Sequence, residues 1–230
     1  MPERGEANLR REIVRICRRL YERELIAASE GNVSARMRGG SILITPAGAS
    51  KSDLEESDLV VVSPRGQTVA AAQRPSSELG MHLRIYERRR DVHAVVHAHP
   101  PLATAFAVAG EDLMEPVLPE LLVQTRGVPL VPYAAPGSGA LADAFEPFLP
   151  LHDAFLMANH GATTLGATLS VAYQRMETLE HVARILLAAR LLGRVTPLTE
   201  EQRRELLASS AEDRTSASIS GTSGSTPPPE

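Results

Sequence analysis

Hydrophobic residues recur at helical spacing near the start of the chain and again towards its end. The first set, Leu9, Ile13, Ile16, Leu20 and Leu25, predicts an amphipathic helix over residues 6–28. The second set, Ala172, Met176, Leu179, Ala183, Leu186 and Leu187, predicts a helix over residues 169–192. This second helix is long enough to cover a sheet and to reach a neighbour.

Short hydrophobic runs between these helices are typical of strands. They lie at residues 42–45, 59–62, 68–70, 92–100, 128–131 and 154–157. Pro64-Arg65-Gly66-Gln67 predicts the turn of a hairpin between the second and third runs. Helices are expected over 75–90, 101–109 and 139–149. The alternation predicts an α/β layer architecture, in which the hairpins make the sheet mixed or antiparallel.

Composition narrows the class of protein. The 230 residues, 43% hydrophobic and 23% charged, predict one large globular domain or two small ones. A net charge of −4 without a basic stripe argues against a nucleic-acid binder. No run of 18 apolar residues and no signal-like start are present, and the lone Cys17 cannot form an internal disulfide. We therefore expect a cytoplasmic protein that has no membrane contact.

The composition changes near the C-terminal end of the chain. Beyond Leu207, Ser, Thr, Gly and Pro dominate, and such a segment cannot bury enough apolar surface to fold. We expect a folded domain over 1–208 and a disordered tail over 209–230.

Two histidines on one predicted strand are the first candidates for chemistry. His97 and His99 are two residues apart, so on a strand both side chains point the same way, with Cα atoms roughly 6 to 7 Å apart. Both rings can then reach one metal ion at about 2.0–2.1 Å. His93 shares their face but lies roughly 13 Å before His97, so it is left out of the site. Taken alone, the pair fits equally well with two histidines that only pack at a strand end.

A third histidine and a carboxylate strengthen the metal hypothesis. His160 follows the predicted strand 154–157 directly, and three imidazoles are a ligand set used by catalytic zinc. Glu78 lies early in a predicted helix, one element before the histidine strand. It either stabilises the helix N-terminus or serves as ligand and proton carrier beside a metal.

Three short segments carry donors of the kind that bind phosphate. They are Gly31-Asn32-Val33-Ser34, Thr45-Pro46-Ala47-Gly48, and the serines Ser76 and Ser77 at a predicted helix N-terminus. Each alone is an ordinary turn or cap. Together they indicate an anion pocket separate from the metal, so that a substrate is held at one end and polarised at the other.

In this order the motifs resemble those of the class II aldolase/adducin family, over roughly residues 9–207. The matching pieces are Gly31-Asn32-Val33-Ser34, Thr45-Pro46-Ala47-Gly48, Pro75-Ser76-Ser77-Glu78, His97-Ala98-His99, Val131-Pro132-Tyr133 and Asn159-His160-Gly161. The resemblance implies a three-layer α/β/α sandwich with a central mixed, largely antiparallel sheet. It also implies a homotetramer with sites at subunit interfaces.

The resemblance also implies roles for individual residues. His97, His99 and His160 are implied to bind zinc or another divalent metal such as manganese or cobalt. Glu78 is implied as the fourth ligand and as the acid/base that leaves the metal when substrate binds. The phosphate-binding positions of the family match Asn32, Gly48, Ser76 and Ser77.

The chain departs from the family pattern in two places. Ala47 stands where relatives have a hydroxyl residue, so one contact to phosphate is missing. Leu118-Pro119-Glu120-Leu121 stands where a catalytic tyrosine is found, and Glu120 is the nearest ionisable candidate. No tyrosine follows Tyr173 either. We expect Glu120 or water to handle the proton on the departing aldehyde.

The expected activity is metal-dependent, reversible cleavage of a ketose 1-phosphate, similar to fuculose 1-phosphate, to dihydroxyacetone phosphate and a short aldehyde. The same site also suits an epimerase of a pentulose phosphate, a decarboxylase of a keto acid phosphate or a dehydratase of a thio-sugar phosphate, because specificity lies outside the shared scaffold. A third hypothesis is a non-catalytic, adducin-like module. The retained histidines and Glu78 argue against it.

Overall fold

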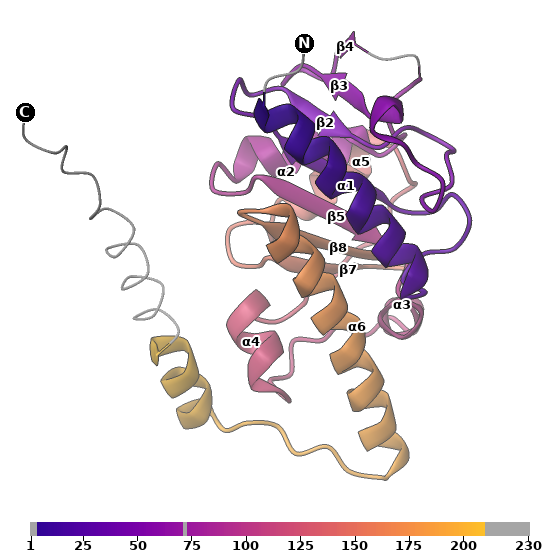
Figure 1. Cartoon of the computed structure of the whole chain (residues 1–230). Coiled ribbons are helices and arrows are strands. Elements are labelled where there is room, and N and C mark those ends of the chain that lie inside the picture. The colour runs from indigo at the N-terminus through magenta and orange to yellow at the C-terminus, as the bar shows by residue number, and fades with distance from the viewer. Residues whose placement is uncertain (1–3, 71–72, 210–230) are drawn as a thin grey trace, which may run out of the picture.

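A mixed sheet forms the middle layer of the protein. The computed structural model describes residues 4–70 and 73–209 (Figure 1). In this part of the chain eight strands take the order β4-β3-β2-β1-β5-β8-β7-β6. Their bounds are β1 (Asn32–Arg36), β2 (Ile42–Ile44), β3 (Val60–Val62), β4 (Thr68–Ala70), β5 (Ala94–Ala98), β6 (Leu130–Val131), β7 (Ala154–Met157) and β8 (Gly161–Gly166). Only β6 and β7 pair in parallel, and all other neighbours are antiparallel.

Helices cover both faces of this sheet. One face carries α1 (Arg4–Glu22), α3 (Pro101–Val108), α4 (Pro119–Thr125) and α6 (Leu169–Leu191), and the other carries α2 (Leu79–Arg88) and α5 (Gly139–Phe145). Figure 1 shows α1 and α6 in front of the strands and α2 and α5 behind them. The predicted α/β/α sandwich with a largely antiparallel sheet is therefore confirmed.

Alternation along β5 decides which face receives the chemistry. Ala94, Val96 and Ala98 lie in the hydrophobic core under α1 and α6. Val95 lies in the second core, which α2 and α5 cover. Because His97 shares the parity of Val95, its side chain faces α2. The HxH strand thus presents its histidine to the helix that follows Glu78.

The first helix is shorter than the predicted 6–28. It ends at Glu22, and Glu24 then takes a positive φ of 57°. Leu25 and Ile26 are nevertheless buried. Their spacing continued the helical pattern, but the backbone has a different partner, since the Leu25 carbonyl accepts the His99 amide at 3.0 Å. This contact ties the end of the histidine strand to the end of α1.

The helix predicted over 75–90 also begins later, at Leu79. Pro75 pairs with Pro46 in an isolated bridge, and the Ser76 amide donates to the Thr45 carbonyl at 3.1 Å. This pairing places Ser76 just before α2, and Ser77 lies in the turn that leads into the helix. Both serines therefore lie beside the 45–48 loop.

Several strand predictions differ from the structure. The 92–100 run contains a shorter strand, Ala94–Ala98, so His99 lies just past its end. Residues 32–34, interpreted as a turn or cap, instead begin β1, and β8 and α4 were not predicted. In β1 every second residue is polar and yet Asn32 and Ser34 are buried. The alternation of polar and apolar residues over these five positions is itself a strand signal, which the interpretation as a turn passed over.

Two further elements are shorter than predicted, because the helix expected over 139–149 ends at Phe145 and the strand expected over 128–131 is Leu130–Val131. The end of the chain is only partly described. Residues 200–209 are helical, so the expected start of a tail at 209 falls at the end of a helix. The rest of the expected tail, 210–230, lies outside the described residues. Within the described ranges, no helix combines the length and apolar character that a membrane crossing requires.

Candidate active site

Neighbouring strands bring the site residues to one edge of the sheet. In the register of the sheet, Asn32 on β1 pairs with His97 on β5, and His97 pairs with Thr163 on β8. The β7–β8 turn holds His160 at the same edge, because its amide donates to the Met157 carbonyl at 3.0 Å. Asn159 takes a φ of 54° in this turn, a conformation that asparagine tolerates better than most residues. Three segments far apart in the sequence thus converge.

The three predicted metal ligands lie together. The ring centroids of His97, His99 and His160 are 4.8 to 5.1 Å apart, and one nitrogen from each ring lies within 4.8 Å of the others. Gly161 allows this packing, since a Cβ there would lie 2.6 Å from both the Ala98 carbonyl and the His99 ring. The three histidines that the sequence predicts as ligands are close enough together to bind one divalent metal ion.

Hydrogen bonds fix which ring nitrogens face the centre. The His97 Nδ1 lies 2.9 Å from the Ala162 carbonyl, which can only accept, so Nδ1 carries the hydrogen. The His99 Nδ1 faces the Glu30 carboxylate at 3.4 Å. In the neutral rings both Nε2 atoms then carry lone pairs, and they lie 3.2 Å apart. Two lone pairs at this distance repel one another unless a cation lies between them.

Glu78 closes the centre from the α2 side. Its Oε2 lies 3.0 Å from the His97 Nε2, and its Oε1 lies 3.3 Å from the His160 Nε2. A tetrahedral zinc with bonds of about 2.0–2.1 Å places its ligand atoms about 3.3 Å apart. The Glu78 Oε1 is buried without a hydrogen-bond partner among the described residues. Three imidazoles and a carboxylate with one orphaned oxygen fit a divalent cation.

Burial and the neighbouring polar groups shift the pKa of Glu78 in opposite directions. Burial alone would raise its pKa, but the electrostatic interaction with His97 and the hydrogen bond from Asn32 outweigh burial and hold the pKa of Glu78 well below its usual range. Burial lowers the pKa of His160 to about 4 and also lowers that of His99. The carboxylate is therefore ionised and both imidazoles are neutral near pH 7, the states in which they bind metal.

A chain of buried hydrogen bonds extends behind Glu78. The Asn32 Nδ2 donates to the Glu78 Oε2 at 2.8 Å, and the Asn32 Oδ1 faces the His82 Nε2. The His82 Nδ1 lies 2.7 Å from the Ser34 hydroxyl, which lies 2.8 Å from the Tyr86 hydroxyl. Because burial lowers the pKa of His82 to about 3, the ring is neutral. The Asn32 Oδ1 can only accept, so the one proton of the ring lies on Nε2. Each hydrogen bond, from Tyr86 through Ser34, His82 and Asn32, is then donated in the direction of Glu78.

Sequence reasoning did not find this chain of hydrogen bonds. His82 and Tyr86 lie four and eight residues after Glu78, which is one face of a helix. That spacing was the available signal. Asn32 was expected to bind phosphate. In the structure both ends of its side-chain amide already contact protein groups, the nitrogen Glu78 and the oxygen His82.

A cavity of about 340 Å³ opens beside the histidines. The predicted residues Asn32, Gly48, Ser76, Ser77 and Glu78 all line it, with His99 and His160. Lys51, which the sequence did not single out, lines it too. Glu120 does not: it is exposed in the first turn of α4, away from these lining residues.

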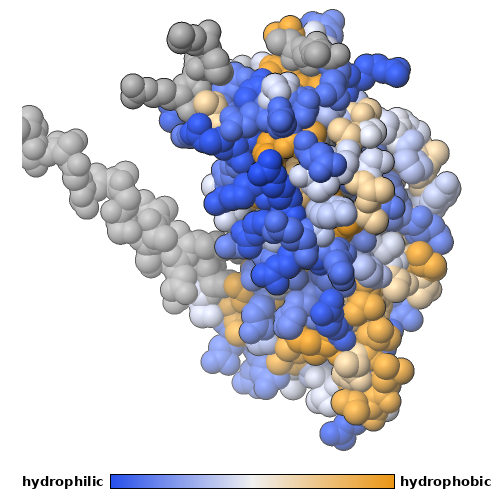
Figure 2. Space-filling view, turned by 45° about the vertical axis from the view of Figure 1, so that its right-hand side comes forward, coloured by the Kyte–Doolittle hydropathy of each residue, from blue (hydrophilic) through white to orange (hydrophobic). Residues whose placement is uncertain are grey.

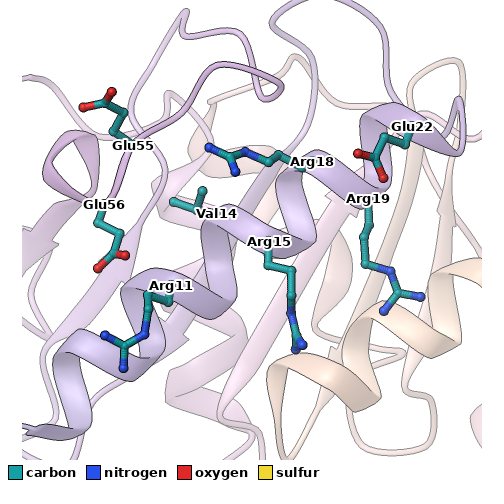
Figure 3. Close-up of a pocket in the computed structure, with 8 residues that line it drawn as sticks. All are labelled: Arg11, Val14, Arg15, Arg18, Arg19, Glu22, Glu55 and Glu56. Carbon is teal, nitrogen blue, oxygen red and sulfur yellow. The ribbon is translucent and has the colours of Figure 1, made fainter.

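Other cavities lack this chemistry. One of about 510 Å³ lies along α1, where Arg11, Arg15 and Arg18 extend from the helix, and Glu55 and Glu56 lie near its Arg11 end (Figure 3). The same helix forms a hydrophilic band in Figure 2. Alternating charges on an exposed helix are ordinary solvated surface, and no histidine lines this groove.

Comparisons with known proteins agree with the geometry. The model of the family described as Class II Aldolase and Adducin N-terminal domain matches residues 11–187. The chain is similar to an L-fuculose phosphate aldolase of Methanococcus maripaludis, with 37% identity over 76% of this chain and 93% of the relative.

Two further similarities come from enterobacterial proteins. A 3-oxo-tetronate 4-phosphate decarboxylase of Pectobacterium atrosepticum is 31% identical over 79% of this chain and 85% of the relative. The crystal structure of YgbL from Escherichia coli, titled a putative aldolase/epimerase/decarboxylase, matches with a TM-score of 0.82 and 31% identity, over 88% of this chain and 99% of that one.

Proposed function

This chain belongs to the class II aldolase and adducin family, as an enzyme acting on a small sugar phosphate, and from that premise we propose that it is a metal-dependent carbon-carbon lyase. The proposed reaction is the reversible cleavage of a ketose 1-phosphate, similar to fuculose 1-phosphate, to dihydroxyacetone phosphate and a short aldehyde. The convergence of His97, His99, His160 and Glu78 on one centre is the observation that carries this proposal.

The metal in this proposal is zinc, with manganese and cobalt as alternatives of similar ligand preference. His97, His99 and His160 hold it through Nε2, and Glu78 is its fourth ligand in the resting enzyme. When bound, the cation polarises the substrate carbonyl and stabilises the negative charge that develops as the carbon–carbon bond breaks. Glu30 and the Ala162 carbonyl orient His99 and His97 for this purpose.

Glu78 moves the proton in this proposal. Its carboxylate is ionised in the resting site, so it can take a proton from the carbon next to the carbonyl of dihydroxyacetone phosphate, or return one. Asn32 holds one oxygen of this carboxylate, while the other oxygen has no hydrogen-bond donor within the described ranges. The cavity residues Gly48, Ser76 and Ser77, with Asn32 beside Glu78, bind the phosphate.

The experiment is a substrate panel with Glu78→Gln as its matched variant. The metal-loaded enzyme is expected to release dihydroxyacetone phosphate from a ketose 1-phosphate, and to exchange a carbon-bound proton of dihydroxyacetone phosphate with solvent. Glu78→Gln should lower both rates by about 10²–10⁴-fold. Unchanged exchange in Glu78→Gln would refute the role of this carboxylate, and no product from any ketose phosphate would refute the aldolase.

A decarboxylase of a keto acid phosphate is the second candidate. Cleavage to an aldehyde needs a base that takes the proton from the hydroxyl that becomes the aldehyde oxygen, and Glu120 of the same chain is exposed and lines none of the cavity. Loss of carbon dioxide from a carboxylate needs no such base. The similarity to the decarboxylase of Pectobacterium favours the same candidate. Release of carbon dioxide from a 3-oxo acid 4-phosphate in the same panel would identify it.

We also propose a homotetramer in which Glu120 acts at the site of a neighbouring copy. Exposed hydrophobic residues support an assembly: Val108, Ile185, Leu187, Leu191 and Leu192 lie on α3 or at the end of α6, where Figure 2 shows hydrophobic surface. Sedimentation equilibrium should give four times the mass of one chain. In Glu120→Gln, cleavage should slow while proton exchange of dihydroxyacetone phosphate is retained.

Two further proposals concern the bounds of the domain and the location of the protein in the cell. The family domain spans 1–208, as the sequence predicts, and limited proteolysis that removed only residues beyond it would support that boundary. The protein is proposed to work in the cytoplasm, where its sugar phosphate is available.

A further inference from the structure

Lys51 is a buried cation in the cavity beside the proposed metal centre. It follows the 45–48 loop, and only 2% of its surface is exposed. Its Nζ donates to the Ser29 carbonyl at 3.0 Å and to the Ala49 carbonyl at 2.8 Å. The side chain lines the cavity together with Gly48, Ser76 and Ser77.

The charge of Lys51 has no counter-ion among the residues that the structure describes. An ammonium has three donors, and only two of them have a protein acceptor among the described residues. No described carboxylate lies within ion-pair distance, whereas Arg84 and Arg89 each contact two or more. Burial lowers the pKa of Lys51. A buried ammonium without a partner is costly unless something supplies negative charge.

The titratable group that interacts with Lys51 cannot supply that charge. Lys51 interacts with Cys17, but burial raises the pKa of this thiol to about 12, so it is neutral at pH 7. Glu30 and Glu78, which also line the cavity, contact the histidines instead. The negative charges of the cavity therefore lie beside the histidines, and none of them pairs with the positive charge of Lys51.

The groups around Lys51 are donors as well. Gly48 has a φ of +71°, and a Cβ there would meet no atom within 4 Å, so its backbone is open to the cavity. Within the described part of the chain, the backbone amides of Gly48 and Ser77 donate to no acceptor. A doubly charged phosphate monoester offers three acceptor oxygens to such a set of amides, hydroxyls and one ammonium.

We propose that Lys51 binds the phosphate of the substrate, supplying the positive charge of a subsite completed by Gly48, Ser76 and Ser77. This inference rests on the proposed function for the identity of the ligand. It assigns the charge in the anion pocket to a residue in the loop where Ala47 offers no hydroxyl. Metal and Lys51 then hold opposite ends of one ketose phosphate.

The test compares binding of dihydroxyacetone phosphate and unphosphorylated dihydroxyacetone to the metal-loaded protein by titration calorimetry. Lys51→Met removes the charge and should weaken binding of the phosphate ester by about 10- to 100-fold. Binding of dihydroxyacetone should not change. Arg15→Met, which removes an exposed cation of α1, is the matched control and should bind both ligands as the original chain does.

A second variant guards against misfolding. Lys51→Gln keeps amide donors for the carbonyls of Ser29 and Ala49 but carries no charge, so it should show the same selective loss. If either folded variant binds the phosphate ester as tightly as the original chain, the proposal is wrong. Irreversible inactivation by borohydride with dihydroxyacetone phosphate would also overturn it, because Lys51 would then form an imine.

Binding and turnover separate the two proposals. A protein that binds dihydroxyacetone phosphate through Lys51 but cleaves no ketose phosphate would refute the aldolase and leave this subsite standing. A working aldolase whose affinity for the phosphate ester is independent of Lys51 would refute the subsite alone.

Discussion

His82 and His160 lie on either side of Glu78 and look alike by two common measures. Both rings are largely removed from solvent, and burial lowers the pKa of His82 to about 3 and of His160 to about 4. Their hydrogen bonds differ. Both nitrogens of His82 have partners, Ser34 and Asn32. The Nδ1 of His160, in contrast, is buried without a partner among the described residues, and its Nε2 faces Glu78.

This difference separates a structural histidine from a ligand. Burial and a lowered pKa say only that a ring is neutral, which both roles require. Complete hydrogen bonding shows that a ring is satisfied by the fold itself, while open nitrogens that converge with other rings indicate a site that can bind a cation. Removing each histidine should therefore affect different properties of the protein.

The largest expected effect is on metal affinity. His160→Ala should lower the affinity for zinc by more than about 100-fold, beyond the usual cost of losing an outer partner. The free energy of unfolding of the metal-free protein should not fall, because the removed ring has an unsatisfied nitrogen. Competition with a chromophoric chelator measures the first quantity and urea unfolding the second.

The control for this variant is His181→Ala, which removes an exposed histidine of α6. It should leave the affinity for zinc unchanged. An unchanged affinity in His160→Ala itself would exclude His160 as a ligand and break the contrast with His82.

Next in size is the effect of His82 on stability. His82→Ala leaves the Asn32 carbonyl and the Ser34 hydroxyl without their buried partner and should lower the free energy of unfolding by about 1–3 kcal/mol. Zinc should still bind to the folded variant, because the three ligand rings remain. Urea unfolding at pH 7 and the chelator titration test both statements.

The contrast would fail if His82→Ala lost zinc as completely as His160→Ala does. His82 would then act as part of the metal centre rather than as its support.

The same contrast explains what the sequence could and could not predict. The spacing of His97 and His99 and the strand before His160 were sufficient to predict the ligands, because strand geometry alone directs them. The sandwich was predictable from alternating elements and from the motif order. The partners of His82 were not, since Asn32 and Ser34 lie on a strand that pairs with β5 only in the folded sheet.

The boundaries that sequence reasoning missed have a related cause. Leu25 and Ile26 continue the hydrophobic spacing of α1, but the backbone there accepts a bond from His99 instead. No signal in the sequence pointed to Lys51, because the feature that distinguishes it is burial without a carboxylate partner among the described residues. Long-range contacts decide both cases, and no local pattern contains them.

The third effect concerns pH. The folded pKa of His82, about 3, lies below its ordinary value of 6.5, so between these values the unfolded chain binds more protons. Stability should therefore fall as pH falls below 6.5, by up to about 1.4 kcal/mol for each pH unit. His82→Gln cannot titrate and should show a flatter profile in urea unfolding between pH 6.5 and 5.

Glu78 acts in the same direction only at lower pH. Its pKa is held below the usual 4.5, so its contribution is lost as the unfolded carboxyl takes up a proton. If His82→Gln kept the full slope between pH 6.5 and 5, another group would be responsible, and the neutral His82 of the hydrogen-bond chain would be contradicted.

The smallest effect lies at the far end of the hydrogen-bond chain. Tyr86→Phe removes the hydroxyl that donates to Ser34 and should lower the free energy of unfolding by about 0.5–1.5 kcal/mol. Zinc affinity should stay the same, because Ser34, His82 and Asn32 keep their other contacts. Tyr133→Phe, at a ring that is 64% exposed, is the matched control and should change stability by less than about 0.5 kcal/mol. A loss of zinc in Tyr86→Phe would show that the satisfied network and the open metal centre act as one unit, because a change four hydrogen bonds from Glu78 would then alter the ligands themselves.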